Sequence, residues 1–169
     1  SGPVNTDQVA TMASYTYSEL GNPKVAILYE TTQVDTVDMA KAFKDTYTGL
    51  GGEIVAEATY QINDVEFRAQ LTSLAQSNPS YLFMPVMGYK EAGYVAKQLS
   101  ELGLGDIKLI GNYVYDTEDL LTLAGPELEG CIFATDGDLS DSRFDEIKAE
   151  YQEYQQATGM SLHMPGLKA

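Results

Sequence analysis

The polar side chains of this 169-residue sequence that could take part in chemistry are grouped in short loops, each of which follows an apolar run. The loops offer hydroxyl, amide, phenol and carboxylate groups, but they hold no histidine, cysteine or lysine. Such groups recognise a small ligand through hydrogen bonds and aromatic contact. We therefore expect reversible binding with neither catalysis nor a cofactor. The candidate ligand-binding residues are Thr31, Thr32, Asp35, Met87, Tyr89, Asn112, Tyr113, Tyr115 and Asp136.

Motifs for the common cofactors and catalytic groups are absent from the sequence. No glycine-rich dinucleotide or phosphate-binding loop and no nucleophile elbow occurs. Residues 136–142 alternate acidic and hydroxyl side chains, but Asp141 and Ile147 stand where a calcium loop needs glycine and glutamate. The single Cys131 excludes an internal disulfide, and the single His163 lacks the partners of a zinc site. We expect no metal site.

The charge balance excludes further classes of protein. The sequence has 25 acidic and 10 basic residues, a formal net charge of -15 and a pI near 4.2. This excess of carboxylates repels phosphate backbones and anionic lipid surfaces, so we expect no binding to nucleic acid. No run of about 18 apolar residues is present, which argues against a membrane-spanning helix.

Short apolar runs alternate along the sequence with amphipathic segments whose apolar residues recur at helical spacing. Glycine or proline stands at nearly every junction between them. This alternation predicts a single α/β domain over residues 1–169: a three-layer, doubly wound, mostly parallel sheet of about five strands. Ligands bind such sheets beyond the carboxyl ends of the strands, where the polar loops lie. Residues 160–169 are expected to form an extended tail. The predicted strands are 24–29, 53–60, 81–84, 108–111 and 130–135.

The predicted helices lie between these strands. Phe43 and Tyr47 belong to the helix that covers the first strand, and the helix after the second strand is expected to begin at Asn63 or Asp64. Thr117 is expected to cap a short helix, and a long acidic helix after the fifth strand is expected to carry Phe144, Ile147, Tyr151 and Tyr154.

The order of the motifs resembles the second lobe of type I periplasmic-binding-protein-fold receptors, and in particular the branched-chain amino-acid (Leu/Ile/Val) binding proteins of ABC importers. The resemblance covers residues 6–159. Each motif is weak alone, but their shared order and spacing are specific. The matching segments are residues 23–30, 40–44, 51–57, 64–71, 78–79, 97–103 and 124–130.

The resemblance implies that the chain is one ligand-binding lobe, a fragment of a longer two-lobe receptor that closes on its ligand by a hinge. The implied partners are a small amino-acid-like or aromatic molecule, the missing first lobe and the membrane permease of an ABC transporter. The implied location is extracytoplasmic, in the periplasm or as a lipoprotein on the outer face of the cell membrane.

The family's ligand residues carry over only in part. A Tyr-Gly pair of the family is matched by Asp35 and Thr36, the acidic residue that receives the ligand ammonium is matched by Tyr113 beside Asn112, and the aromatic segment after the third strand is matched by residues 87–89. These departures favour an aromatic or hydrophobic ligand at Tyr113 and Tyr115, with Asp35 or Asp136 meeting a cation. Packing of Tyr113 against the missing lobe is an equal alternative.

Two other functions stay open at this point. A flavodoxin-like electron carrier would hold the FMN phosphate at the threonines after the first strand, although no glycine accompanies them. A sensor lobe of a regulator would use the same fold. A phosphorylated receiver domain is excluded, because Met84 and Pro85 stand where it needs an aspartate.

Overall fold

The computed structural model describes residues 3–134, and the side chains from residue 6 onward. Strands and helices alternate along this part of the chain, as the sequence predicts. The elements are α1 (Pro3–Ser18), β1 (Val25–Glu30), α2 (Val34–Gly49), β2 (Ile54–Tyr60), α3 (Arg68–Ala75), β3 (Tyr81–Phe83), α4 (Tyr89–Glu101), β4 (Lys108–Gly111), the 3-10 helix η1 (Tyr113–Tyr115), α5 (Glu118–Ala124), the 3-10 helix η2 (Pro126–Leu128) and β5 (Ile132–Phe133).

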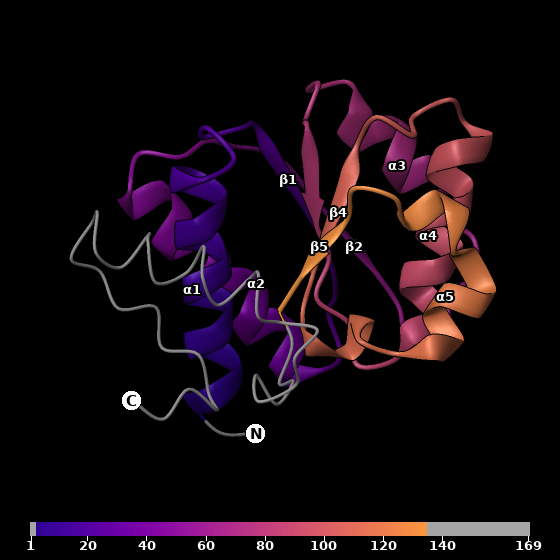
Figure 1. The fold of residues 1–169 in the computed structure, drawn as a ribbon, viewed down its shortest axis with the longest axis horizontal. Helices are drawn as coiled ribbons and strands as arrows, with labels where there is room; N and C mark the ends of the chain where they lie inside the picture. Colours follow the sequence, from indigo (N-terminus) through magenta and orange to yellow (C-terminus); the bar gives the residue numbers. More distant parts are fainter. Residues whose placement is uncertain (1–2, 135–169) are drawn as a thin grey trace, which may run out of the picture. The chain divides into compact units, whose positions relative to one another are not determined.

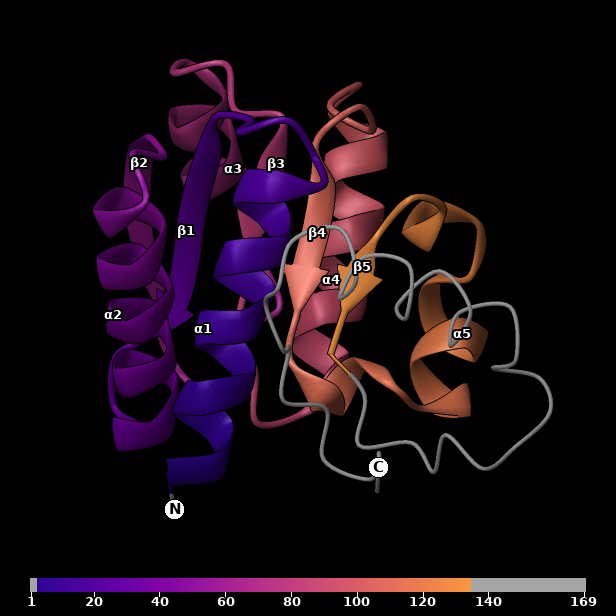
Figure 2. The same cartoon turned by 60° about the vertical axis from the view of Figure 1, so that its left-hand side comes forward.

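The five strands form one sheet in the order β2-β1-β3-β4-β5, and every neighbouring pair is parallel. Helices α1 and α2 cover one face, and α3, α4 and α5 cover the other (Figure 1). Figure 2 shows β1 between α2 and α1, with β4 and β5 farther along the sheet beside α4. These observations confirm the predicted doubly wound, three-layer α/β architecture.

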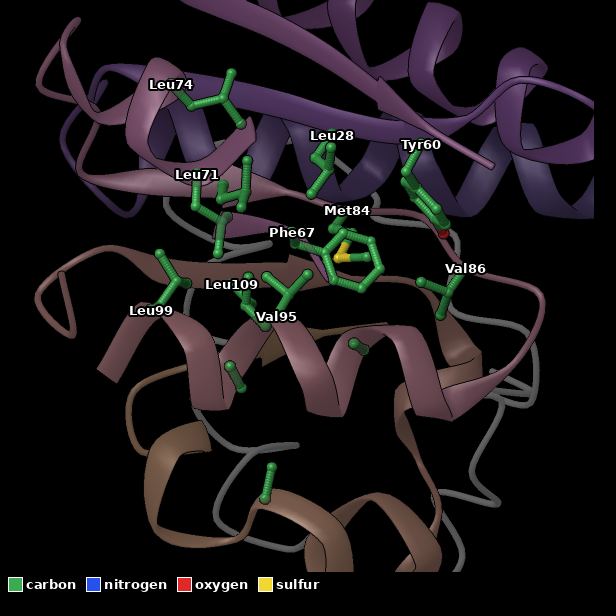
Figure 3. Close-up of a cluster of buried hydrophobic side chains, with 14 of the residues drawn as sticks. Leu28, Tyr60, Phe67, Leu71, Leu74, Met84, Val86, Val95, Leu99 and Leu109 are labelled. Atoms are coloured by element: carbon green, nitrogen blue, oxygen red, sulfur yellow. The ribbon is translucent and has the colours of Figure 1, made fainter. Parts of the chain in front are cut away.

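The inner strands of the sheet are covered on both faces, which explains why β1 and β3 are mostly apolar, whereas β2 at the edge of the sheet carries exposed Glu57 and Thr59. In β1, Val25 and Ile27 face the cluster beneath α1 and α2, whereas Ala26 and Leu28 face the cluster beneath α3 and α4. The ring of Phe43 from α2 stacks on Phe83 of β3, with 4.1 Å between centroids. The second cluster includes Tyr60, Phe67, Leu71, Met84, Val86, Val95 and Leu109 (Figure 3).

The boundaries of two elements differ from the prediction. The third helix was expected to begin at Asn63 or Asp64, but α3 begins at Arg68. Asn63 adopts a left-handed φ of 67°, and Asp64 accepts a hydrogen bond from the Gln61 N–H at 2.9 Å. These two residues therefore close a turn after β2 and do not cap the helix. The fifth strand is shorter than predicted and spans only Ile132–Phe133.

Three further predictions concern a helix cap, membrane-spanning helices and the C-terminal residues. Thr117 caps α5 as expected, because its hydroxyl oxygen accepts a hydrogen bond from the Asp119 N–H. No helix within residues 3–134 is both long and apolar enough to cross a membrane. Asp136, the acidic helix expected to carry Phe144 and Tyr151, and the tail at 160–169 lie outside the described residues.

Candidate functional site

The strand order places a topological switch point between β1 and β3. The chain leaves β1 for α2 on one face of the sheet, and it leaves β3 for α4 on the other face (Figure 1). The two loops therefore diverge, and the surface between them lies beyond the carboxyl ends of the strands. Ligands of open α/β sheets bind at this position. The candidate site is accordingly built from the loops that follow β1, β3 and β4.

The loop after β1 is organised by a buried carboxylate. Glu30, only 3% exposed, accepts hydrogen bonds from the Thr32 N–H and hydroxyl at 2.6 Å and from the Gln33 N–H at 2.7 Å. Burial opposes the charge of Glu30, but these hydrogen bonds and one from the Ile62 backbone outweigh it and lower the pKa of Glu30. An ionised carboxylate therefore occupies the N-terminal end of α2.

The same loop is hydrogen-bonded to the residue that follows β2, and its outer side chains are exposed to solvent. The Gln61 side-chain amide donates to the Thr31 hydroxyl at 3.1 Å, and the Thr36 hydroxyl donates to the Glu30 carbonyl at 2.8 Å. Thr31 and Thr32 are exposed, and Asp35 is half-buried in the first turn of α2. Hydrogen bonds to Glu30 and Gln61 thus hold the loop in place, and its exposed side presents hydroxyl groups and one carboxylate.

The loops after β3 and β4 are held by two side chains that were predicted to bind ligand. Asn112, 3% exposed, accepts from the Val86 N–H at 3.1 Å and donates to the Val86 carbonyl at 2.9 Å. Tyr115 is also 3% exposed, and its hydroxyl donates to the Met84 carbonyl at 3.0 Å. Both polar groups are already satisfied inside the core. We therefore expect Asn112 and Tyr115 to position the loops of the candidate site, and their predicted role in ligand binding stays a prediction.

The other predicted residues that the structure describes lie in the loops beyond the carboxyl ends of the strands. Met87 is 45% exposed in the loop after β3, and Tyr89 begins α4 in a half-buried position. Tyr113 lies half-buried in η1, which follows β4 directly. Together with Thr31 and the residues beside it, these side chains give a surface of aromatic, thioether and hydroxyl groups.

Sequence reasoning missed three residues that organise this end of the sheet. Glu30 ends a buried strand, and an acidic residue immediately before a hydroxyl-rich helix start was the signal available. Gln98 of α4 is buried and brackets the loop after β2, accepting from the Phe67 N–H at 2.7 Å and donating to the Val65 carbonyl at 2.8 Å. Tyr60 ends β2 with its ring in the core. The contacts of Gln98 and Tyr60 depend on residues distant in the sequence.

A cavity lies near the amino end of β4, away from the loops of the candidate site. This cavity of about 150 Å³ is bordered by the end of α4, the start of β4 and η2. The Cys131 sulfur in its wall accepts a hydrogen bond from the Leu109 N–H at 3.4 Å, and burial raises the pKa of the Cys131 thiol. Within residues 3–134, no cluster of three or more acidic, histidine or cysteine side chains could hold a metal ion.

Strand order and loop placement define the class: an open, doubly wound α/β fold whose candidate ligand surface lies at a switch point. The chain belongs to the periplasmic binding protein family, whose family model matches residues 1–168. No functionally curated protein matches the sequence.

Three solved structures illustrate the likeness of fold. The leucine-binding protein LivK of Thermotoga maritima has a TM-score of 0.75 at 23% identity, over 96% of this chain and 45% of that one. LivJ of Streptococcus pneumoniae, in complex with isoleucine, has a TM-score of 0.72 at 23% identity, with the same coverage of 96% and 45%. An R. palustris solute-binding protein in complex with benzoate has a TM-score of 0.67 at 22% identity, over 95% and 43%. The chain thus spans less than half the length of these structures.

Proposed function

We propose that this chain is one lobe of the solute receptor of an ABC importer, and that it binds a small amino-acid-like or aromatic ligand reversibly and without catalysis. The observation that carries the proposal is the set of exposed side chains at the switch point, supported by loops that buried Glu30 and Asn112 hold in place. Membership of the periplasmic binding protein family supports the same role. The receptor acts outside the cytoplasm, with a first lobe and a membrane permease as partners.

The mechanism follows from the arrangement of the loops. Pre-positioned loops lose little conformational entropy when they contact a ligand, which favours specific recognition. A second lobe would complete the contacts and exclude water when a hinge closes the two lobes. A single lobe makes only part of these contacts, so we expect its affinity to be about millimolar.

The ligand class is argued from the chemistry of the surface. Met87, Tyr89 and Tyr113 supply apolar and aromatic contact, and Thr31 supplies a hydroxyl group. Leucine-like and aromatic ligands fit this combination. Isoleucine and benzoate, which are bound in two of the similar structures, fall in the same two classes.

The flavodoxin-like alternative shares the observed strand order, so the fold alone does not separate the two functions. The loop after β1 separates them. A flavin phosphate would need the free N–H groups at the start of α2, but the Glu30 carboxylate already accepts from the Thr32 and Gln33 N–H groups. Its negative charge repels a phosphate in this position. FMN binding at this loop is therefore disfavoured.

The test is an amide chemical-shift titration of the 169-residue chain with millimolar leucine, phenylalanine, benzoate and FMN. We expect selective shifts at residues 31–36, 86–89 and 113 with an amino acid or with benzoate. Tight binding of FMN alone would overturn the proposal in favour of an electron carrier. A sensor lobe of a regulator shares the binding step, so this titration tests ligand binding and does not distinguish a sensor from a transport receptor.

A further inference from the structure

The cavity near the amino end of β4 lies beside an unpaired stretch of that strand. β4 and β5 are aligned over two residue pairs, Ile110 with Ile132 and Gly111 with Phe133. The chain reaches β5 through η2 and Gly130, whose φ of 82° is left-handed. Within residues 3–134, no strand therefore runs beside the first two residues of β4 on this side. The cavity of about 150 Å³ occupies this position, between β4, the end of α4 and η2.

A backbone donor in the cavity wall has a weak acceptor. The Lys108 N–H donates to the Ser80 carbonyl at 3.1 Å, on the β3 side. Successive N–H groups of a strand point to opposite neighbours, so the Leu109 N–H faces the side of the cavity. Its partner there is the Cys131 sulfur at 3.4 Å, and sulfur is a weaker acceptor than oxygen. Leu109 is 1% exposed, so a weak hydrogen bond at its N–H is costly, and an oxygen that enters the cavity would offer it a stronger one.

The other walls of the cavity fit an apolar body of limited size. Leu99 near the end of α4 and Leu109 are buried, and Ile107 before β4 is half-buried. Burial raises the pKa of the Cys131 thiol, so this group is a neutral S–H that can donate weakly to a ligand oxygen. An apolar cavity of about this volume holds a molecule of the size of benzene.

The charged groups around the cavity disfavour an ion in it. Glu127 lies in η2, Glu129 follows η2, and Lys108 begins β4. A ligand carboxylate would meet the two glutamates, and an ammonium group would face the positive end of the Leu109 N–H dipole. Either ion would also lose hydration against the apolar side chains. A neutral molecule avoids these costs.

We propose that this cavity is a second binding site, for a small neutral molecule with an apolar body and one hydroxyl or carbonyl oxygen, which accepts the hydrogen bond of the Leu109 N–H in place of the Cys131 sulfur. The apolar body has about five or six carbon atoms, and the affinity is about millimolar. The cavity lies at the amino end of β4, whereas the loops of the candidate site follow the carboxyl ends of the strands. The inference therefore goes beyond the proposed function and does not depend on it.

The experiment titrates the 169-residue chain with three molecules that share one carbon ring: cyclopentanol, cyclopentane, which lacks the oxygen, and cyclopentylamine, which is a cation at neutral pH. The signals followed are the Leu109 amide and the methyl groups of Leu99 and Ile107. We expect cyclopentanol to shift all of them. Cyclopentane should bind about tenfold more weakly and leave the Leu109 amide nearly unchanged, because it cannot accept a hydrogen bond. Cyclopentylamine should leave all three residues unchanged.

Two substitutions at Cys131 change the site in opposite directions. Cys131→Leu places a larger side chain in the cavity wall and should abolish cyclopentanol binding. Cys131→Ala removes the sulfur that accepts from the Leu109 N–H, so it should tighten cyclopentanol binding about fivefold and cyclopentane binding by less. Thr48→Ala, at an exposed position of α2 on the other face of the sheet, is the control and should leave every affinity unchanged. Urea unfolding checks that each variant is folded.

Several outcomes would overturn the cavity site. These are unchanged Leu99, Ile107 and Leu109 signals with cyclopentanol, or equal affinities for cyclopentanol and cyclopentane. Cyclopentanol shifts that persist in folded Cys131→Leu and are confined to residues 31–36, 86–89 and 113 would move the molecule to the candidate site and would also overturn the proposal. Should Cys131→Leu fail to fold, an unchanged cyclopentanol affinity in Cys131→Ala would overturn it. The proposed function is tested separately with leucine, phenylalanine and benzoate at the loops, so its failure is distinguishable from failure of the cavity site.

Discussion

The side-chain amide of Asn112 brackets the backbone of Val86, accepting from its N–H at 3.1 Å and donating to its carbonyl at 2.9 Å. Asn112 directly follows β4, and Val86 belongs to the loop after β3. One buried side chain therefore ties together two loops of the candidate site and satisfies two backbone groups that lie outside the sheet ladder. Its geometry leads to the first prediction.

Asn112→Asp should destabilise the chain by about 3 kcal/mol, because a carboxylate cannot donate to the Val86 carbonyl and would bury an unpaired charge. Urea unfolding at neutral pH measures the loss. Asn63→Asp is the matched control, since Asn63 is exposed and tolerates the same change within about 0.5 kcal/mol. Equal losses in the two variants would contradict the structural role of Asn112.

Glu30→Gln should lower stability by about 1 to 3 kcal/mol at neutral pH, because it replaces one of the two acceptor oxygens by an NH2 group that would face a hydrogen-bond donor. The folded-state pKa of Glu30 lies below its ordinary value of 4.5, so the stabilisation is present above pH 4.5 and is lost as pH falls through the lowered pKa. Unfolding curves of parent and variant should therefore converge in acid. The exposed Glu53→Gln variant is the control, and a pH-independent difference for Glu30→Gln would argue against an ionised carboxylate.

Gly111→Ala should destabilise the fold by about 1 to 3 kcal/mol, because a Cβ at this position would lie 2.4 Å from the ring of Tyr115. Adding Tyr115→Ala removes the Cγ and ring atoms that the new Cβ would meet, so the double variant should lose less than the sum of the two single losses. Gly105→Ala meets nothing within 4 Å and is the matched control. Strict additivity in thermal or urea unfolding would show that the two positions do not interact.

Tyr115→Phe and Tyr113→Ala should separate positioning from binding. The first removes the hydrogen bond to the Met84 carbonyl and should cost about 1 kcal/mol of stability, with ligand affinity nearly unchanged. The second removes a half-buried ring at the proposed binding surface and should weaken ligand binding several-fold with a smaller effect on stability. Urea unfolding combined with the amide titration measures both quantities. The reverse pattern would place Tyr115 in the ligand-binding set.

The sequence alone was sufficient for the layer architecture, because each element follows from local periodicity. The apolar runs around Ile27, Phe83 and Ile110 predicted buried parallel strands, and the segment around Phe43 and Tyr47 predicted a covering helix. Thr117 was predictable as a cap because capping involves neighbours only. The same local signals failed after β2, where Asp64 closes a turn that competes with the helix start.

The tertiary structure decided which polar side chains of the loops are exposed and which are used within the protein. Asn112, Tyr113 and Tyr115 are nearly adjacent in the sequence and share a loop composition, yet the partners of Asn112 and Tyr115 lie 26 and 31 residues away. Hydrogen bonds between distant segments exist only once the strands are ordered, so no local pattern encodes them. The fold is therefore determined by periodicity in the sequence, whereas the site is determined by which buried polar groups are satisfied from elsewhere in the fold.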